Sequence, residues 1–499
     1  MTERGTTVSA APNSVRTHLP AITVWGATVG YAVIAAYFSL RRHDAFLTGY
    51  DLANFDQELW LLAHGHQPLN TQTGRLFWGE HFSLTIALLT PLYVLGGGAK
   101  ALLSLQALTM VAVAPLLYAL ARAYGARPWL ATLPALLWLA SPLTLLANLF
   151  DVHHVPLVVP LIVGSILALR YDRLALFVAL GLLACFAKED VPLMYSMLGI
   201  VVALEGRRKL GAAISAVSFG IFVFAVAVYM PAFGDSASWF AKRFAGARGT
   251  TVVDVFVWMA SHPLAAADQV FTAQNVTDCL VLILMTGGLC LLAPRWMLLG
   301  APALLHNVLS AYPPQNDLTT HYFVPVAVSF AIAAAVGVRR LAEISQRKRL
   351  LVAACTATAF FSFFIGVSSA RTSSDLSAAP HANAGGVAAR LRAISLVPDD
   401  AVVAATPRLS AHLSEREEIY ALPLPFLGRE AYGTDWSAEE MARRAKRVRW
   451  VVIDTDDRPI EFPLVAERIL PLLPELGFHA VFREGSVIVF SREGERFAP

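Results

Sequence analysis

Long runs of apolar residues recur through the first 369 residues, and no other feature limits the fold as strongly. A transmembrane helix needs about 20 mostly apolar residues, because the hydrocarbon core of a bilayer is about 30 Å thick and a helix rises about 1.5 Å per residue. Of the 499 residues, 56% are hydrophobic and 15% are charged, against roughly 25% charged residues in a typical soluble domain. A single soluble domain is therefore excluded, and we expect an α-helical polytopic membrane protein. We predict eleven spans: Ile22–Leu40, Ala101–Ala121, Leu130–Leu149, His154–Leu169, Leu174–Ala187, Val191–Leu204, Leu210–Met230, Val276–Ala293, Trp296–Ala311, Tyr322–Val338 and Leu350–Val367.

The run Phe82–Leu95 is apolar but short, and it ends in three glycines. Runs of this length are often interfacial, so we predict a juxtamembrane helix here. With that choice and a cytoplasmic N-terminus, the cytoplasmic pieces hold 15 of the 23 Lys and Arg residues before residue 370, and 4 of the 17 Asp and Glu residues. This distribution follows the positive-inside rule. Counting Phe82–Leu95 as a span would place most of the basic turns outside.

Charge also divides the chain, because residues 370–499 hold 35 of its 75 charged residues. We predict a disordered cytoplasmic tail over residues 1–21, a polytopic membrane domain over 22–369 and a small soluble extracytoplasmic α/β domain over 370–499. In the last part the strings AVVAA, VRWVVID and SVIVFS predict strands, and Ala438–Val448 and Leu464–Leu476 predict helices. The net charge of +3 is small and dispersed, so nucleic acid is not expected as a partner.

With this topology most acidic residues of the membrane domain, and several histidines, fall on the extracytoplasmic side, where titratable groups between spans usually have a function. In the first loop, Asp51 and Asp56 belong to an amphipathic helical stretch. A carboxylate beside apolar spans has its pKa raised and suits proton abstraction. The alternative for Asp51 is helix N-capping.

Three further clusters follow the ends of spans. Asp151-Val152-His153-His154 combines residue types that bind a divalent metal, although histidine is also common at membrane interfaces. Lys188-Glu189-Asp190 separates two short apolar runs and forms either an outer turn that binds an anion such as phosphate or a salt-bridged cap. His321 follows the polar string YPPQNDLTT, which either closes over a site or simply connects two spans.

Several strings carry a family resemblance: YDLANFDQELW, GEHFSLTIALLTPLY, NLFDVHHVPLVVPL, FAKEDVPL and PDDAVVAATPRLSAHLSEREEIYALP. In this order they resemble a bacterial family of predicted multi-pass membrane proteins that carries only a domain-of-unknown-function label. The resemblance runs from about Tyr50 to about Asp454. The chain departs from the pattern after Asp151, where the family leads us to expect an aromatic residue, and after His153, where it leads us to expect an acid.

That family in turn resembles the GT-C superfamily of membrane glycosyltransferases. The resemblance implies a polyprenyl-phosphate sugar as donor and a catalytic Asp or Glu in the first extracytoplasmic loop, the position that Asp51 holds. Glu80-His81 is similar to the His-Pro pair that ends this loop in some members, with Phe82 in place of the proline. Fold resemblance alone does not fix function.

We therefore expect an inverting glycosyltransferase of the bacterial plasma membrane, which binds the lipid bilayer and a polyprenyl-phosphate-linked sugar. A transporter or flippase of a lipid-linked or polar solute is the alternative, and it would need internal repeats or broken helices at mid-membrane. A GT-C-like scaffold without catalysis is a further one. No cofactor is specified, although a divalent metal is compatible with the acids and histidines. The candidate catalytic residues are Asp51 and Asp56, and the candidate substrate-binding residues are His81, Asp151, His153, Lys188, Glu189, Asp190 and His321.

Overall fold

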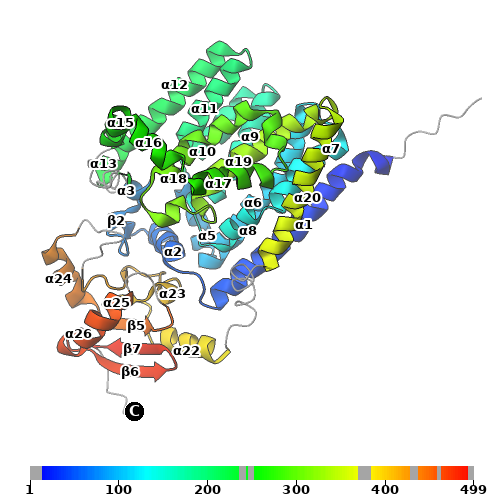
Figure 1. The fold of residues 1–499 in the computed structure, drawn as a ribbon. Coiled ribbons are helices and arrows are strands. Elements are labelled where there is room, and N and C mark those ends of the chain that lie inside the picture. The colour runs from blue at the N-terminus through cyan, green and yellow to red at the C-terminus, as the bar shows by residue number, and fades with distance from the viewer. Residues whose placement is uncertain are drawn as a thin grey trace, which may run out of the picture.

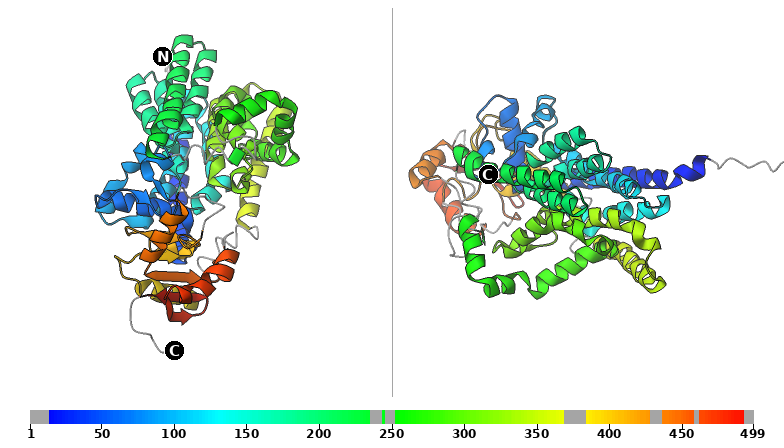
Figure 2. Two further views of the ribbon diagram at one scale, coloured as in Figure 1. Left: turned by 90° about the vertical axis from the view of Figure 1, so that its left-hand side faces the viewer. Right: turned by 90° about the horizontal axis from the view of Figure 1, so that it is seen from above.

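The computed structural model describes residues 14–234, 243–244, 252–368, 384–427, 436–457 and 462–492. Figure 1 shows a large helical body formed by the first part of the chain and a sheet formed by the last part. The first loop, with helices α2 (Tyr50–Ala63) and α3 (Phe77–Glu80), lies between the two, and the views in Figure 2 agree with this arrangement. This loop also contains a short antiparallel pair, β1 (Leu69–Asn70) and β2 (Arg75–Leu76).

Apart from this short strand pair, the body consists of α2, α3 and further helices. In chain order they are α1 (Ser14–Asp44), α4 (Leu84–Ala87), α5 (Thr90–Val94), α6 (Gly98–Ala123), α7 (Pro128–Leu139), α8 (Pro142–Leu149), α9 (His154–Arg170), α10 (Leu174–Cys185), α11 (Val191–Leu204), α12 (Arg208–Phe224), η1 (Ala225–Tyr229), α13 (Met230–Phe233), α15 (Val252–Ser261), α16 (Pro263–Val270), α17 (Ala273–Met285), η2 (Leu289–Leu292), η3 (Pro294–Gly300), α18 (Ala301–Leu309), η4 (Pro313–Asn316), η5 (His321–Phe323), α19 (Val324–Gly337), η6 (Val338–Ala342) and α20 (Gln346–Ser368).

Four helical stretches within the described residues are long and apolar enough to cross a membrane: His18–Asp44, Gly98–Ala123, Arg208–Phe233 and His321–Ala342. The pair α7 and α8 makes a fifth if it is one span, bent by 43°. Shorter apolar helices, among them α9, α10, α11 and α17, fill further predicted spans without reaching the full length. The chain thus has at least four apolar spans, and the number eleven stays a prediction.

Two predicted spans are interrupted for local reasons. The run Leu130–Leu149 bends where Ser141 precedes Pro142, because proline cannot donate the backbone hydrogen bond that would continue helix α7. The run Val276–Ala293 stops being α-helical after Met285, because Gly287 and Gly288 adopt positive φ angles of 61° and 70°.

The helices bury one side and expose apolar side chains on the other. Helix α6 packs against α1, α7 and α9, and α19 packs against α6 inside the body. Outward-facing residues such as Trp25, Val33 and Val217 are more than half exposed. Exposed apolar surface of this extent is typical of helices that face lipid. In the run Phe82–Leu95, the residues that follow α4 and α5, Leu88 and Leu95, are likewise exposed.

The last residues of the predicted disordered tail, residues 14–21, are helical in the structure. Residues 1–13 lie outside the described residues, and residues 14–21 already belong to α1. Helix α1 continues beyond the apolar run Ile22–Leu40 at both ends. Its last turn contains Arg41, Arg42 and His43, and cations interact favourably with the helix dipole at this position.

The C-terminal part is built around a five-stranded mixed sheet of order β4-β3-β5-β7-β6. Strand β3 pairs in parallel with β4 and β5, whereas β7 pairs antiparallel with β5 and β6. Strands β3, β5 and β7 coincide with the three apolar strings of the sequence. The elements are α22 (Ala384–Ser395), β3 (Val403–Ala405), α23 (Pro407–Ser410), β4 (Ile419–Ala421), α24 (Ala438–Arg447), β5 (Trp450–Asp454), α25 (Phe462–Leu464), η7 (Val465–Ile469), α26 (Leu470–Glu475), β6 (His479–Glu484) and β7 (Val487–Ser491).

Candidate functional site

Helix α2 positions the first of the candidate side chains. Its N-cap residue is Gly49, which has no side chain to cap the helix, and Asp51 lies inside the first turn. The carboxylate of Asp151 accepts hydrogen bonds from the backbone N–H of Gly49 at 3.0 Å and of Leu52 at 3.3 Å. Asp151 therefore caps α2 from another part of the chain. Asp51 is thus not the N-cap residue of α2, although its carboxylate lies in the first turn, where an acid interacts favourably with the helix dipole.

One face of α2 borders a cavity of about 370 Å³. Asp51, Asn54 and Glu58 lie on this face, at the spacing of three and seven residues that brings helix positions together. The other walls come from the loop between α8 and α9, the turn between α10 and α11, and the segment from α18 to η5. Seven of the nine candidate residues line this cavity: Asp51, His81, Asp151, His153, Lys188, Glu189 and His321.

His153 and His321 form one wall of the cavity beside Asp51. The two imidazole rings are stacked, with centroids 3.3 Å apart and an angle of 17° between their planes. Nε2 of His153 lies 3.3 Å from Oδ2 of Asp51. Burial, followed by the charge of Asp51, raises the pKa of Asp151 above its ordinary value.

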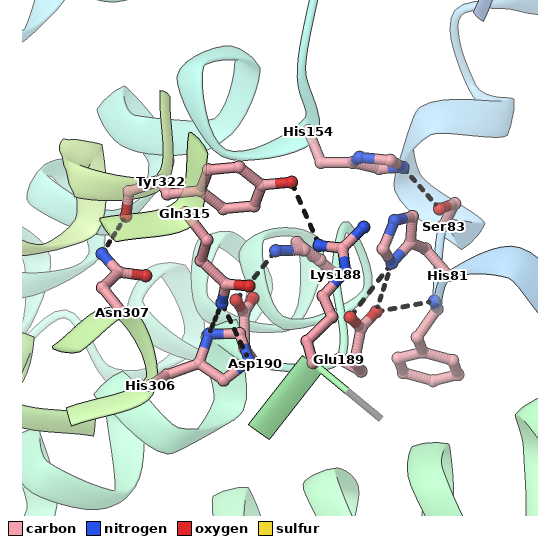
Figure 3. A network of polar contacts seen from close by, with 12 residues as sticks. His81, Ser83, His154, Lys188, Glu189, Asp190, His306, Asn307, Gln315 and Tyr322 are labelled. Atoms are coloured by element: carbon pink, nitrogen blue, oxygen red, sulfur yellow. Dashed lines mark hydrogen bonds and ion pairs between the residues drawn. The ribbon is translucent and has the colours of Figure 1, made fainter. Parts of the chain in front are cut away.

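Lys188 and Glu189 reach the cavity from the turn before α11 (Figure 3). Lys188 Nζ lies 2.9 Å from Asp190 Oδ2. Burial lowers the pKa of Lys188, but the charges of Asp190 and Glu189 outweigh burial, so the pKa of Lys188 is raised. The Glu189 carboxylate interacts with Nδ1 of His81 at 3.0 Å and accepts the backbone N–H of Phe82 at 3.3 Å. Burial raises the pKa of Glu189, but His81 more than offsets it, so that the pKa lies well below its ordinary value. The turn therefore presents one partly buried cation and one partly buried anion.

The facing wall contains polar residues that the sequence analysis did not single out. Nη1 of Arg243 donates to the hydroxyl of Tyr322 at 3.2 Å, and its guanidinium lies 4.5 Å from the centre of the Tyr312 ring. Gln315 donates to His306 at 2.8 Å, and Figure 3 shows this contact beside Lys188. The polar string YPPQNDLTT thus forms a wall of the cavity, because Tyr312, Pro314, Gln315 and Thr320 line it.

The first loop adds an acidic pair, Glu58 and Glu80, that is not among the candidate site residues. Glu58 is almost fully buried and accepts a hydrogen bond from Asn70 at 3.0 Å. Burial, followed by the charge of Glu80, raises the pKa of Glu58 well above its ordinary value. Glu58 follows Asp51 by seven residues, and this helical spacing was the signal that could have identified it.

Two candidates do not line the cavity. Asp56 is buried on the opposite side of α2, where its carboxylate accepts hydrogen bonds from Tyr93 at 2.6 Å and from Ser414 at 2.7 Å. Burial, with Glu415 nearby, raises its pKa to about 7. Asp190 pairs with Lys188 and precedes α11 as its N-cap residue. Asp56 therefore links α2 to the C-terminal part, and Asp190 forms an ion pair with Lys188.

The three residues considered as metal ligands have different partners. Asp151 binds the N-terminus of α2, His153 Nδ1 lies 2.8 Å from the backbone oxygen of Asp151, and His154 Nε2 lies 2.8 Å from Ser83 Oγ. Over the described ranges, no group of three or more His, Cys, Asp or Glu side chains is arranged to hold a metal ion.

Comparisons with known proteins agree with this architecture. The family described as "Predicted membrane protein (DUF2079)" matches residues 42–467. A search of curated proteins found no match. ArnT from Cupriavidus metallidurans bound to undecaprenyl phosphate aligns at 14% identity over 96% of this chain and 100% of its own, with a TM-score of 0.56.

Two further solved structures align over most of this chain. The apo state of the same ArnT aligns at 13% identity over 94% of this chain and 99% of its own, with a TM-score of 0.53. The oligosaccharyltransferase of Archaeoglobus fulgidus aligns at 13% identity over 93% of this chain and 73% of its own, with a TM-score of 0.43. These neighbours are GT-C glycosyltransferases. At this identity, the likeness to ArnT describes the fold alone.

Proposed function

The chain belongs to the DUF2079 family of predicted membrane proteins, and from that premise and its GT-C-like fold we propose that it is a membrane glycosyltransferase. The proposed reaction moves a sugar from a polyprenyl-phosphate donor to an extracytoplasmic acceptor. One observation carries the proposal: the Asp51 carboxylate and the Lys188 ammonium border the same cavity. A carboxylate suits removal of a proton from an acceptor hydroxyl, and a cation suits stabilisation of a leaving phosphate.

In the proposed step Asp51 takes the proton of the acceptor hydroxyl. The acceptor oxygen forms the new bond to the anomeric carbon of the sugar, and the bond from this carbon to the phosphate oxygen breaks. The electron pair leaves with the polyprenyl phosphate, whose charge faces Lys188 and Arg243. Attack opposite the leaving group inverts the anomeric centre. Within the described part of the chain, Asn54 Oδ1 and His321 Nδ1 have no hydrogen-bond partner, and both residues border the cavity and are suited to bind sugar hydroxyls.

The solved ArnT structure bound to undecaprenyl phosphate supports a lipid phosphate as the ligand to test first. We expect purified protein in nanodiscs to bind undecaprenyl phosphate, and Lys188→Ala to weaken binding about tenfold or more, because a charge-assisted contact to phosphate is lost. Lys100→Ala is the matched control, since Lys100 is 59% exposed and pairs with Asp44 at the surface. Equal binding by all three proteins would remove Lys188 from the proposed site.

The transporter alternative is favoured by one observation, the 43° bend between α7 and α8, because broken helices form transporter sites. The two functions separate in vesicles that contain polyprenyl-phosphate sugars. A glycosyltransferase releases polyprenyl phosphate when an acceptor is present, whereas a flippase moves the intact lipid-linked sugar between leaflets. A protein that binds the lipid and does neither would be a scaffold.

The proposal requires a particular topology. We place the N-terminus in the cytoplasm and residues 370–499 outside, in a bacterial plasma membrane. Reporter fusions at Arg122, Arg208 and Ser345 should then report the cytoplasm, and a fusion after Pro380 should report the outside. A cytoplasmic C-terminal part would contradict the topology and move the cavity to the wrong side for an extracytoplasmic acceptor.

A further inference from the structure

The tautomer of His153 follows from its contact with the main chain. Its Nδ1 lies 2.8 Å from the backbone oxygen of Asp151. A carbonyl oxygen carries no hydrogen and can only accept, so Nδ1 must carry the hydrogen. In the neutral ring the other nitrogen, Nε2, then has a lone pair and no proton.

Nε2 is the nitrogen that faces Asp51, at 3.3 Å from Oδ2. A carboxylate and an unprotonated nitrogen repel each other at this distance, so the pair gains from taking up one proton between Oδ2 and Nε2. The lone pair of Nε2 can accept such a proton once Asp51 has received it. Catalytic hydrogen bonds are often long without substrate and shorten in the reacting complex.

Several contacts keep His153 in this orientation. Its backbone N–H donates to Oε1 of the fully buried Gln106 at 2.9 Å, and Gln106 in turn donates to the backbone oxygen of Asp151 at 3.3 Å. The stacked His321 ring covers one face of the imidazole, and the His153 side chain is only 9% exposed. The ring therefore has little freedom to turn away from Asp51. The other titratable groups that interact electrostatically with the pair are Asp151, His154 and His321.

We propose that His153 is a positioning residue that acts through Asp51, so that the base of the reaction is the Asp51–His153 pair. This inference rests on the proposed function. When Asp51 removes the proton from the acceptor hydroxyl, the proton moves on to the lone pair of His153 Nε2. Asp51 then returns to the carboxylate form, and His153 becomes an imidazolium with both nitrogens protonated. The positive ring then faces the carboxylate that delivered the proton.

The first test does not depend on any transfer assay. Full-length protein labelled with ¹⁵N-histidine is examined by NMR in nanodiscs, and the His153 signals are identified by their loss in His153→Gln. We expect the shift of a protonated Nδ1 at neutral pH, and an Nε2 shift that changes in Asp51→Asn. A His153 ring protonated at Nε2 alone, or one whose signals ignore Asp51→Asn, would overturn the inference.

The second test uses turnover. His153→Gln can keep an N–H directed at Asp51 but cannot accept the proton, so we expect kcat to fall about 10- to 100-fold with little change in KM, less than the loss of the base itself. Adding His153→Gln to Asp51→Asn should cost nothing further if the two residues act as a unit. Independent, multiplicative losses would contradict the pair. If the wild-type protein transfers no sugar while the NMR result holds, the proposed function fails and the contact between Asp51 and His153 Nε2 stands.

Discussion

The carboxylate of Asp151 accepts the backbone N–H of Gly49 at 3.0 Å, across 102 positions of the sequence. Gly49 is the N-cap of α2 and has no side chain that could cap the helix. The helix that carries Asp51 is therefore held at its start by the loop that carries His153. This link fixes the spacing between two walls of the cavity, and it gives Asp151 a structural role as the acceptor of the N–H groups at the start of α2.

Asp151→Ala should remove this cap. We expect the free energy of unfolding to fall by about 1 kcal/mol, the usual cost of losing a helix cap, and turnover to fall because α2 is no longer held. Asp151→Asn should keep most of the stability, because asparagine is about as good a cap as aspartate. Thermal unfolding in detergent, measured beside turnover, checks both variants. If the alanine and asparagine variants were equally unstable, the cap would not be the reason for the loss.

Most of the residues that the sequence singled out line the cavity, but one of them lies on the wrong face of α2. The topology argument and the local motifs pointed to Asp51, Lys188 and His321, which lie far apart along the chain and border one cavity. Asp56 follows Asp51 by five residues, a rotation of roughly 140° on a helix, so both could not face one site. Glu58 follows by seven residues, within roughly 20° of Asp51, and was overlooked. Helical geometry, applied to the loop, would have corrected both.

Other features had no sequence signal strong enough to find. Arg243 lies far along the chain from the motifs, and only the packed structure brings it to Tyr322. Strand β4 has three residues, and β6 includes Arg483 and Glu484, so neither forms the long apolar run that indicates a buried strand. The docking of α2 on Ser414 is a tertiary contact between segments more than 350 residues apart.

Asp56 should make stability depend on pH. Burial raises its pKa to about 7, from about 4 in an unfolded chain. Between these values the folded protein binds more protons than the unfolded one, so the free energy of unfolding falls as the pH rises through this window. The loss should be about 2 kcal/mol between pH 5 and pH 7, since one pKa unit corresponds to about 1.4 kcal/mol.

Asp56→Asn should remove that part of the pH dependence. Asparagine can accept from Tyr93 through its oxygen and donate to Ser414 through its nitrogen, so both contacts survive without a charge. Thermal unfolding of both proteins from pH 5 to pH 8 is the measurement, and the difference between them isolates Asp56 from other titrating groups. Parallel curves would mean that Asp56 titrates as it does in the unfolded chain. Turnover should change little, because Asp56 is outside the cavity.

Helices α11 and α12 should depend on a close approach at Gly211. A Cβ atom there would lie 2.5 Å from the backbone nitrogen of Ala203 and 2.7 Å from its Cβ. Gly211→Ala should therefore destabilise the protein by about 1–3 kcal/mol, the usual cost of overpacking. Gly220→Ala is the matched control on the same helix, because nothing lies within 4 Å of a Cβ at that position. It should be neutral or slightly stabilising, since alanine favours helix. Equal losses of thermal stability in the two variants would argue against a tight crossing.

Asp51→Asn tests the proposed base directly. The substitution keeps the shape and the capacity for hydrogen bonding but cannot accept the proton, so turnover should fall about 10²- to 10⁴-fold. Protein amount and binding of undecaprenyl phosphate should stay near normal, because Asp51 is 38% exposed and Asp151 supplies the helix cap. Asp44→Asn is the control, an exposed acid at the end of α1 that pairs with Lys100, and it should retain full activity. Full turnover, or full rescue of a deletion strain, by Asp51→Asn would take Asp51 out of the mechanism and leave the cavity as a binding site only.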